Sequence, residues 1–279
     1  MVYIVIFVIA FFAVLFLWLN NNILVKTEYE IKCAEKGGFV AVHLSDLHSK
    51  SFGNRLYKKV MKISPDVIFI TGDLVDDTRT NKRVFALTKR LCEHFSVYYI
   101  CGNHDHRIEK MQENLDMLSS FGVKVLRDEI DCVKIKNEEV AILGLDENQA
   151  SKDDYKLQKK GKYVYTDNTK YFDALSMCGG IKIVLSHYPE NFALIGDISY
   201  KNYDFDVMLS GHAHGGQVRL PFVKGLFAPG EGIFPKYAEG KIGTRPCLIV
   251  SRGLGNSNFP FRVFNLPEIC VLHFTEKNR

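Results

Sequence analysis

The sequence predicts an α/β fold in which helices cover a mixed sheet. Short runs of β-branched residues alternate with helical stretches along most of the 279 residues. Several of these runs end in Asp, His or Asn, as strands do where they deliver ligand-binding groups to one edge of an α/β sheet. At about 150 residues per domain, the length fits one large domain better than two small ones.

The composition is that of a globular protein. Apolar residues make up 47% and charged residues 24% of the chain, which excludes disordered, collagen-like and multi-span membrane proteins. The net charge of +4, from 36 basic and 32 acidic residues, is small for this length. We therefore expect no nucleic-acid partner.

The first expected element is an apolar segment from Val2 to Leu19 that contains no charged or strongly polar residue. Its 18 residues would form a helix of about 27 Å, enough to cross a thin bilayer. A cleavable signal peptide would have basic residues before this run and a small-residue site after it, whereas Asn20, Asn21 and Asn22 follow. A buried helix would keep a polar stripe. We therefore expect a single-pass transmembrane anchor in the cell membrane over 1–19.

The next segment, 20–37, is expected to be a linker to a domain over 38–279. Lys26, Lys32 and Lys36 follow the apolar segment closely. An excess of basic residues after a span favours a cytoplasmic location for the domain that follows. Three lysines give a small bias, and an extracytoplasmic domain is the alternative.

Within the domain, β-branched runs predict strands and helical periodicity predicts the helices between them. The expected strands are 39–44, 67–71, 97–101, 133–135, 140–145, 181–186, 207–210, 248–251 and 269–274. The expected helices are 55–63, 82–95, 108–121 and 170–177. The stretch 147–169 is rich in Lys, Asp and Tyr and is expected to be an exposed excursion. Together these elements predict an α/β sandwich.

The seven cysteines are scattered, odd in number and never spaced as C-x-x-C. This pattern disfavours both a disulfide framework and a Cys-based zinc site. Most of them, including Cys101 and Cys270, lie in apolar runs where a thiol serves as a small buried hydrophobe. We expect reduced thiols in the core.

The polar residues that carry chemistry follow the expected strands. Five segments contribute them: Asp46 with His48, Asp73, Asn103 with His104 and Asp105, His187, and His212 with His214. Each motif alone is weak, since ordinary turns carry the same residues. Because the carboxyl ends of strands meet at one edge in an open α/β sheet, their joint occurrence predicts a common site.

Most of these side chains can bind a metal ion. The candidate ligands are Asp46, His48, Asp73, Asn103, His187, His212 and His214. The mixture of carboxylate, amide and imidazole groups suits Mn²⁺, which we favour, or Fe²⁺ or Zn²⁺, and is too rich in nitrogen for Ca²⁺ or Mg²⁺. Seven ligands exceed the needs of one ion, whereas two ions about 3.5–4 Å apart that share a carboxylate would use them all. Gly72, Gly102 and Gly211 are expected to let the backbone turn sharply before a ligand.

This order of motifs resembles the calcineurin-like metallophosphoesterase superfamily from about Gly38 to the C-terminus. Two segments are similar to its membrane-anchored bacterial YkuE/YaeI-type branch. They are Gly211-His212-Ala213-His214-Gly215-Gly216-Gln217-Val218-Arg219-Leu220-Pro221 and Ser251-Arg252-Gly253-Leu254-Gly255, with Arg262 and Pro267-Glu268-Ile269 beyond. The resemblance implies a four-layer α/β/β/α sandwich that hydrolyses phosphoesters with two metal ions.

The resemblance also implies a role for each residue of the site. Asp46, His48 and His214 would hold the first ion. Asn103, His187 and His212 would hold the second, and Asp73 would bridge the two. His104 would protonate the leaving group or stabilise the transition state, and Asp105 would orient His104.

Two departures from the family argue against a protein phosphatase. Ser/Thr phosphatases carry an Arg after the G-D-x-V-D block, where this chain has Gly72-Asp73-Leu74-Val75-Asp76-Asp77-Thr78. They also have G-N-H-E where this chain has Gly102-Asn103-His104-Asp105. Of the remaining histidines, we expect His43, His94 and His273 in the core or in solvent. The same is favoured for His106, with a place beside the site as the alternative.

The loop from Gln217 to Tyr237 is unusually apolar. It carries Phe222, Leu226, Phe227, Ile233 and Phe234, together with Arg219, Lys224 and Lys236. A loop of this kind either packs onto the domain, which we favour, or faces an apolar ligand. Next to a membrane anchor, the second alternative would suit a lipid-linked phosphoester.

The sequence therefore predicts a membrane-anchored, metal-dependent phosphoesterase that acts on a phosphomonoester or phosphodiester. One alternative is a pyrophosphatase for a lipid-linked nucleotide, as the resemblance to UDP-diacylglucosamine pyrophosphatases implies. Another is a non-catalytic metal-binding scaffold, against which the complete ligand set and His104 argue.

Overall fold

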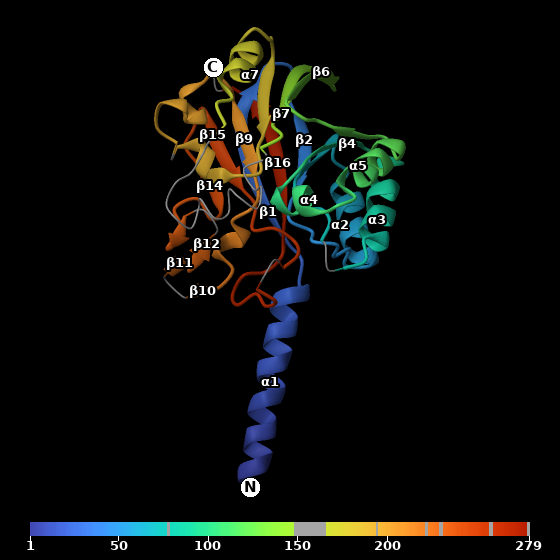
Figure 1. Cartoon of the computed structure of the whole chain (residues 1–279), viewed down its shortest axis with the longest axis vertical. Helices are drawn as coiled ribbons and strands as arrows, with labels where there is room; N and C mark the ends of the chain where they lie inside the picture. Colours follow the sequence, from blue (N-terminus) through green and yellow to red (C-terminus); the bar gives the residue numbers. More distant parts are fainter. Residues whose placement is uncertain are drawn as a thin grey trace.

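The apolar N-terminal segment forms one long helix, α1 (Val2–Asn22), which projects from the rest of the chain (Figure 1). The computed structural model describes residues 1–76, 79–147, 166–193, 195–220, 223–228, 231–256 and 259–277. The helix is long and apolar enough to cross a membrane, and its most apolar window is 0% buried. The side chains in this window therefore do not pack into the core of the domain.

The segment expected to be a linker contains a strand, so this prediction is wrong. Strand β1 (Val25–Ala34) pairs in parallel with β16 (Glu268–Glu276) at the edge of a sheet. Ile31 and Cys33 are buried, while the intervening Lys32 is exposed. Only two residues separate α1 from β1, so the helix joins the domain directly.

The strands form two six-stranded sheets. The first has the order β1-β16-β2-β3-β4-β5, in which the further strands are β2 (Phe39–Leu44), β3 (Val67–Thr71), β4 (Ser96–Ile100) and β5 (Val123–Val125). The second has the order β14-β15-β9-β8-β7-β6, formed by β6 (Glu129–Ile135), β7 (Glu138–Gly144), β8 (Ile181–Leu185), β9 (Val207–Ser210), β14 (Gly240–Ile242) and β15 (Cys247–Val250). Apolar side chains of both sheets share one core, so the sheets pack face to face.

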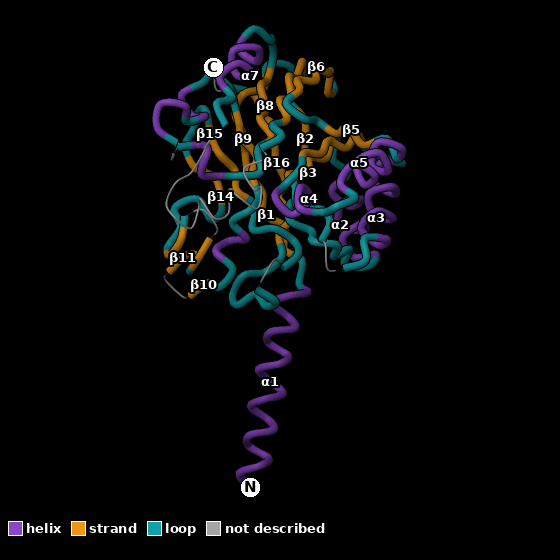
Figure 2. Tube along the Cα trace, viewed as in Figure 1, coloured by secondary structure: helices purple, strands orange, loops and turns teal. Residues whose placement is uncertain are grey.

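Helices cover the outer faces of both sheets (Figure 2). On the first sheet, α2 (Asn54–Ile63), α3 (Lys82–Cys92) and α5 (Met111–Ser120) bury a second core against β2, β3 and β4. On the second sheet, α7 (Thr169–Ser176) and 3₁₀ turns at Pro189–Phe192, Gly196–Ile198 and Tyr200–Asn202 bury a third. Central strands such as β3 are buried on both faces, as parallel strands between two layers must be. The predicted four-layer α/β/β/α sandwich is confirmed.

Some local predictions differ from the structure. A short helix, α4 (Asn103–Arg107), was not expected, and two small hairpins occur at β10–β11 (Arg219–Leu220, Val223–Gly225) and β12–β13 (Phe227–Ala228, Gly232–Ile233). Most of the expected exposed excursion, residues 148–165, lies outside the described residues. At its described ends, Thr166 and Asp167 are exposed as expected, whereas Glu147 and Asn168 are buried, so the prediction is wrong for these two residues.

All seven cysteines are free, but not all are in the core. Cys33, Cys101, Cys247 and Cys270 are buried, as expected. Cys92 and Cys178 are half-buried and Cys132 is exposed, so the core assignment is wrong for these three.

The directions of the strands place the polar residues that follow β2, β3 and β4 near α1. Strand β1 is separated from α1 by two residues and runs away from it, and β16 is parallel to β1. Strand β2 is antiparallel to β16, and β3 and β4 are parallel to β2. The carboxyl ends of β2, β3 and β4 therefore lie at the end of the domain from which α1 emerges.

Candidate metal centre

The structure brings all seven predicted ligand side chains together. They are Asp46 and His48 after β2, Asp73 after β3, Asn103 at the start of α4, His187 after β8, and His212 and His214 after β9. Each of these residues is at most 8% exposed. Buried polar groups in such number need partners, and here they face one another.

The first cluster contains Asp46, His48 and His214. Their potential ligand atoms all lie within 4.8 Å of one another. The Nε2 atoms of His48 and His214 are 3.2 Å apart, and His214 Nε2 is 3.5 Å from Asp46 Oδ1. Ligand atoms at about 2.0–2.2 Å from one ion would be separated by about 3.0–3.5 Å. The cluster therefore has the spacing of a metal site.

The second cluster contains Asn103, His187 and His212. Asn103 Oδ1 is 3.2 Å from His187 Nε2 and 2.9 Å from His212 Nδ1. Asp73 lies between the two clusters, because its Oδ2 is 3.6 Å from His48 Nε2 and 3.5 Å from His187 Nε2. One carboxylate oxygen thus faces both clusters.

The electrostatics of the site suit a cation. Burial lowers the pKa of His48 to about 4 and holds those of His212 and His214 well below the usual value, so these imidazoles stay neutral with lone pairs available. Burial also acts to lower the pKa of His187, but the carboxylates of Asp73 and Asp46 outweigh it and raise that pKa to about 10. Positive charge is therefore strongly favoured between these carboxylates. The donor set fits two divalent ions of the borderline type.

The backbone is strained where it presents these side chains. Asp46, His48, Asp73, His212 and His214 all have positive φ, a conformation that is uncommon for residues with a side chain. Such strain is typical of functional sites, where the surrounding structure holds it in place.

Two of the three predicted turn glycines serve another purpose. Gly72 has φ of 84° and turns the chain as expected, but Gly102 and Gly211 do not have positive φ. A Cβ at Gly102 would collide with the Asp73 carboxylate, and one at Gly211 would collide with that of Asp46. Here glycine is required for close approach to a ligand.

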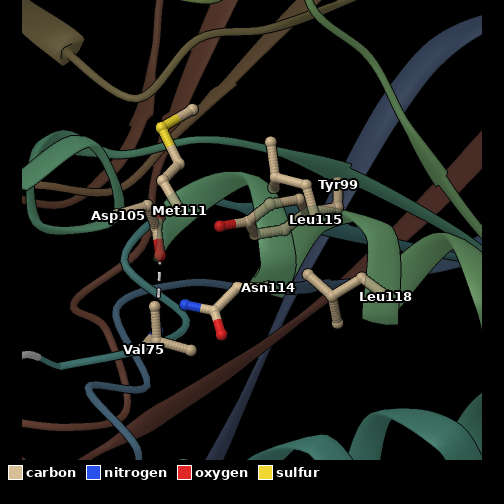
Figure 3. Close-up of a pocket in the computed structure, with 7 residues that line it drawn as sticks. All are labelled: Val75, Tyr99, Asp105, Met111, Asn114, Leu115 and Leu118. Atoms are coloured by element: carbon tan, nitrogen blue, oxygen red, sulfur yellow. Dashed lines mark hydrogen bonds between the residues drawn. The ribbon is translucent and has the colours of Figure 1, made fainter. Parts of the chain in front are cut away.

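Asp105 fixes the backbone around the ligands. Its Oδ2 accepts hydrogen bonds from the amides of Asp73, at 2.7 Å, and Gly102, at 2.8 Å. Its Oδ1 accepts a longer bond of 3.4 Å from the Val75 amide, at the edge of a small pocket of about 10 Å³ (Figure 3). These contacts tie the loop after β3 to the start of α4. The predicted role of Asp105 in orienting His104 stays a prediction.

Glu147 supports the site from behind and was missed by the sequence analysis. Its buried carboxylate accepts hydrogen bonds from the His187 amide at 3.1 Å, Asn191 Nδ2 at 2.7 Å and the Tyr200 hydroxyl at 2.8 Å. Ser186 Oγ donates to the same carboxylate. Burial raises the pKa of Glu147, as expected for a carboxyl group in the core. The only indication of Glu147 in the sequence was an acidic residue shortly after a β-branched run.

The other histidines contact protein groups outside the two clusters. His43 is buried, and its Nε2 lies 2.7 Å from Thr71 Oγ1, while burial lowers its pKa to about 3. His94 pairs with the Tyr57 hydroxyl at 3.1 Å, and His273 lies 3.3 Å from a Glu28 carboxylate oxygen. His106 is paired with Asp146 at 2.8 Å.

Comparisons with known proteins agree with the site. The sequence model described as calcineurin-like phosphoesterase matches residues 39–216. The metallophosphoesterase YkuE of Bacillus subtilis is 28% identical over 275 residues, which covers 94% of this chain and 89% of YkuE. The phosphodiesterase YaeI of Escherichia coli is 28% identical over 214 residues, covering 75% of this chain and 70% of YaeI. The expected resemblance to the YkuE and YaeI branch is confirmed.

A solved structure supports the fold. The sulfate thiohydrolase SoxB of Thermus thermophilus superposes with a TM-score of 0.50 at 11% identity, over 87% of this chain and 57% of SoxB. At this identity the likeness concerns the fold alone.

Proposed function

The chain belongs to the calcineurin-like phosphoesterase family and is a hydrolase of phosphoric esters, and we propose that it works with two divalent metal ions, of which Mn²⁺ is favoured. Members of this family bind two divalent metals. The observation that carries the proposal is the convergence of seven buried ligand groups around Asp73, whose Oδ2 faces both clusters. In this proposal Asp46, His48 and His214 hold one ion, Asn103, His187 and His212 hold the other, and Asp73 bridges them.

The residues of the chain have distinct tasks in this reaction. When bound, the ions supply Lewis-acid stabilisation of the phosphoryl oxygens and a water nucleophile of lowered pKa. His104 is the proposed proton donor to the leaving oxygen: its ring lies edge-on to His48, with centroids 4.7 Å apart, and it is 9% exposed. The backbone amide of His104 donates a hydrogen bond to Asp73 Oδ1 at 2.8 Å. This bond holds His104 close to the carboxylate that is proposed to bridge the ions.

The finer proposal is that the substrate is a phosphoester of a membrane lipid. The site lies at the end of the domain from which α1 emerges, and Lys50, two residues after the ligand His48, donates a hydrogen bond to Asn21 O at the end of α1. Burial, together with the nearby charges of Arg262, Arg79 and Arg55, lowers the pKa of Lys50 to about 7, so the positive charge of this group is carried mainly by the three arginines. This basic group beside the site suits an anionic phosphate.

The apolar loop over 217–237 supports the same substrate class. Packing onto the domain was favoured, and Leu226 is half-buried, but Phe227, Ile233 and Phe234 are 52%, 69% and 64% exposed. Phe222 and the side chain of Lys224 lie outside the described residues. Exposed apolar groups beside a site at the membrane end of a domain fit a lipid-linked substrate better than a water-soluble one.

The proposed location is the cell membrane, with α1 as a single transmembrane span and the catalytic domain on the cytoplasmic side. The length and hydropathy of α1 support the span. Lys26, Lys32 and Lys36 support the orientation by the positive-inside tendency. Labelling of the exposed Cys132 in intact cells by a membrane-impermeant maleimide tests the orientation, since a cytoplasmic thiol stays unlabelled until the cells are opened.

A turnover assay tests the activity. The full-length chain in mild detergent should hydrolyse bis(p-nitrophenyl) phosphate when Mn²⁺ is present and stop when the metal is chelated. A non-catalytic scaffold would bind Mn²⁺ without turnover. Lipid extracts then separate the two substrate proposals, because a lipid phosphoester releases phosphate or a phosphorylated headgroup, whereas a lipid-linked nucleotide releases a nucleoside monophosphate.

A further inference from the structure

Two loops expose large apolar side chains on the same end of the domain. Phe227, Ile233 and Phe234 belong to the loop after His214, and Phe259, Phe261 and Phe264 belong to the loop between β15 and β16. These six residues, called here the apolar rim, are between 46% and 69% exposed. Isolated exposed apolar residues are ordinary, but a group of this size on connected loops indicates a binding surface.

Hydrogen bonds connect the two loops close to the metal site. Gln217 Nε2 donates to the backbone oxygens of Phe259, at 2.9 Å, and Phe261, at 3.2 Å. The Arg219 amide donates to Val263 O at 2.9 Å, and Val218 forms a bridge with Val263. Gln217 is three residues from the ligand His214, so the apolar rim is connected to the metal site through a short stretch of chain.

The apolar rim reaches α1 itself. The rings of Phe264 and Phe16 are in contact, with centroids 5.0 Å apart. Phe16 lies three residues before the end of the apolar run at Leu19, which corresponds to about 4.5 Å along the helix axis. If α1 spans the bilayer, Phe264 therefore lies at the same depth as the last apolar turn of α1. Figure 1 shows the red loop before β16 beside the upper end of α1.

The end of α1 is held firmly against the domain. Asn256 Nδ2 donates to Asn21 Oδ1 at 2.7 Å, and Arg55 Nη1 donates to Asn22 O at 3.0 Å. Lys59 Nζ donates to Leu24 O at 3.0 Å. The angle between helix and domain is therefore set by direct contacts, so insertion of α1 also places the apolar rim at the membrane.

Two aromatic residues of the apolar rim have strained backbones. Phe234 and Phe264 have φ of 57° and 51°. Bulky residues rarely adopt this conformation, and it is maintained where the fold gains something from it. In both cases the conformation accompanies a side chain that is more than half exposed.

We propose that the apolar rim is a membrane-docking surface, seated in the interfacial region of the leaflet from which α1 emerges. This inference rests on the proposed anchoring by α1 and adds a second attachment to it. Arg55 and Lys59, which contact the chain at the end of α1, favour a leaflet with anionic headgroups. Docking holds the metal site against the leaflet, so a lipid phosphoester reaches it without leaving the bilayer.

Depth-dependent fluorescence quenching in the full-length chain tests the docking. The only tryptophan is removed by Trp18→Phe, and single reporters are introduced as Phe261→Trp in the apolar rim, Leu15→Trp in α1 and Met177→Trp at the end of α7. Met177 is 86% exposed and α7 lies at the far end of the domain from α1, so it is the matched control (Figure 1). Each variant is reconstituted in vesicles of phosphatidylcholine and phosphatidylglycerol with brominated acyl chains.

The expected result is quenching of the Leu15→Trp and Phe261→Trp reporters and none of the Met177→Trp reporter. Phe261→Trp should lose about half of its emission to shallow bromines, since docked apolar side chains lie about 5–10 Å into the boundary region. Quenching at Leu15 with none at Phe261 would overturn the docking proposal and leave the anchor intact. If the Phe261→Trp reporter is not quenched and chemical crosslinking in the same vesicles yields dimers, a second copy of the chain covers the apolar rim. This result would also overturn the docking proposal. No quenching at Leu15 would overturn both the anchor and the docking that depends on it.

Discussion

Replacing Ile31 by Ala tests whether β1 is part of the folded domain. Ile31 is 3% exposed and packs in the core between the two sheets, whereas its neighbour Glu30 is exposed. A linker in this position would tolerate both Ile31→Ala and Glu30→Ala. A strand would tolerate only the second, which makes Glu30→Ala the matched control.

The magnitude follows from the buried side chain. Ile31→Ala removes three carbon atoms from the core, at about 0.8 kcal/mol each, or about 2.4 kcal/mol. The cavity left behind increases the loss in free energy of unfolding to about 2.5–4 kcal/mol. Glu30→Ala should change it by less than about 0.5 kcal/mol, because exposed side chains and surface ion pairs contribute little.

Thermal unfolding of the full-length chain in one detergent measures the difference. For a domain of this size, each kcal/mol shifts Tm by about 2–4 °C, so Ile31→Ala should unfold about 5–16 °C below the native chain. Equal Tm values for Ile31→Ala and Glu30→Ala would refute the assignment of β1. By the same reasoning, a chain that starts at Ile23 should fold, and one that starts at Gly37 should not, because it lacks the partner of β16.

The remaining predictions concern the site. His104→Ala should lose about 10²–10⁴-fold in rate while its metal content is unchanged, with the greatest loss on poor leaving groups; loss of metal would instead identify His104 as a ligand. Glu147→Gln should weaken metal binding about 10–100-fold in a titration, because Glu147 holds the His187 amide, whereas the exposed control Glu139→Gln should bind normally. Equal metal affinity of these two variants would contradict the positioning role of Glu147.

The main features of the site could be predicted because ligands at strand ends leave a local pattern. Asp46, Asp73 and His187 each directly follow, or lie within two residues of, a β-branched run whose burial is easily predicted. Parallel strands then bring these ends together, whatever the lengths of the connections.

The parts that were missed depend on contacts between distant segments. Strand β1 alternates charged with half-buried residues, and Lys26, Glu28 and Lys32 gave it the composition of a linker although its alternation had the period of an edge strand. Glu147 has hydrogen-bond partners that lie 39 to 53 residues away, so no local pattern marks its role. Phe227 and Phe234 were expected to pack onto the domain, because sequence alone does not indicate that the fold keeps these side chains on the surface.

Metal counting on two aspartate variants tests the binuclear site most directly. Plasma mass spectrometry should find two Mn²⁺ per native full-length chain. Asp46→Asn should keep the ion held by Asn103, His187 and His212, whereas Asp73→Asn should lose more metal and all turnover, because the Asp73 Oδ2 atom faces both clusters. An Asp73→Asn variant that retains two ions and normal turnover would contradict the account.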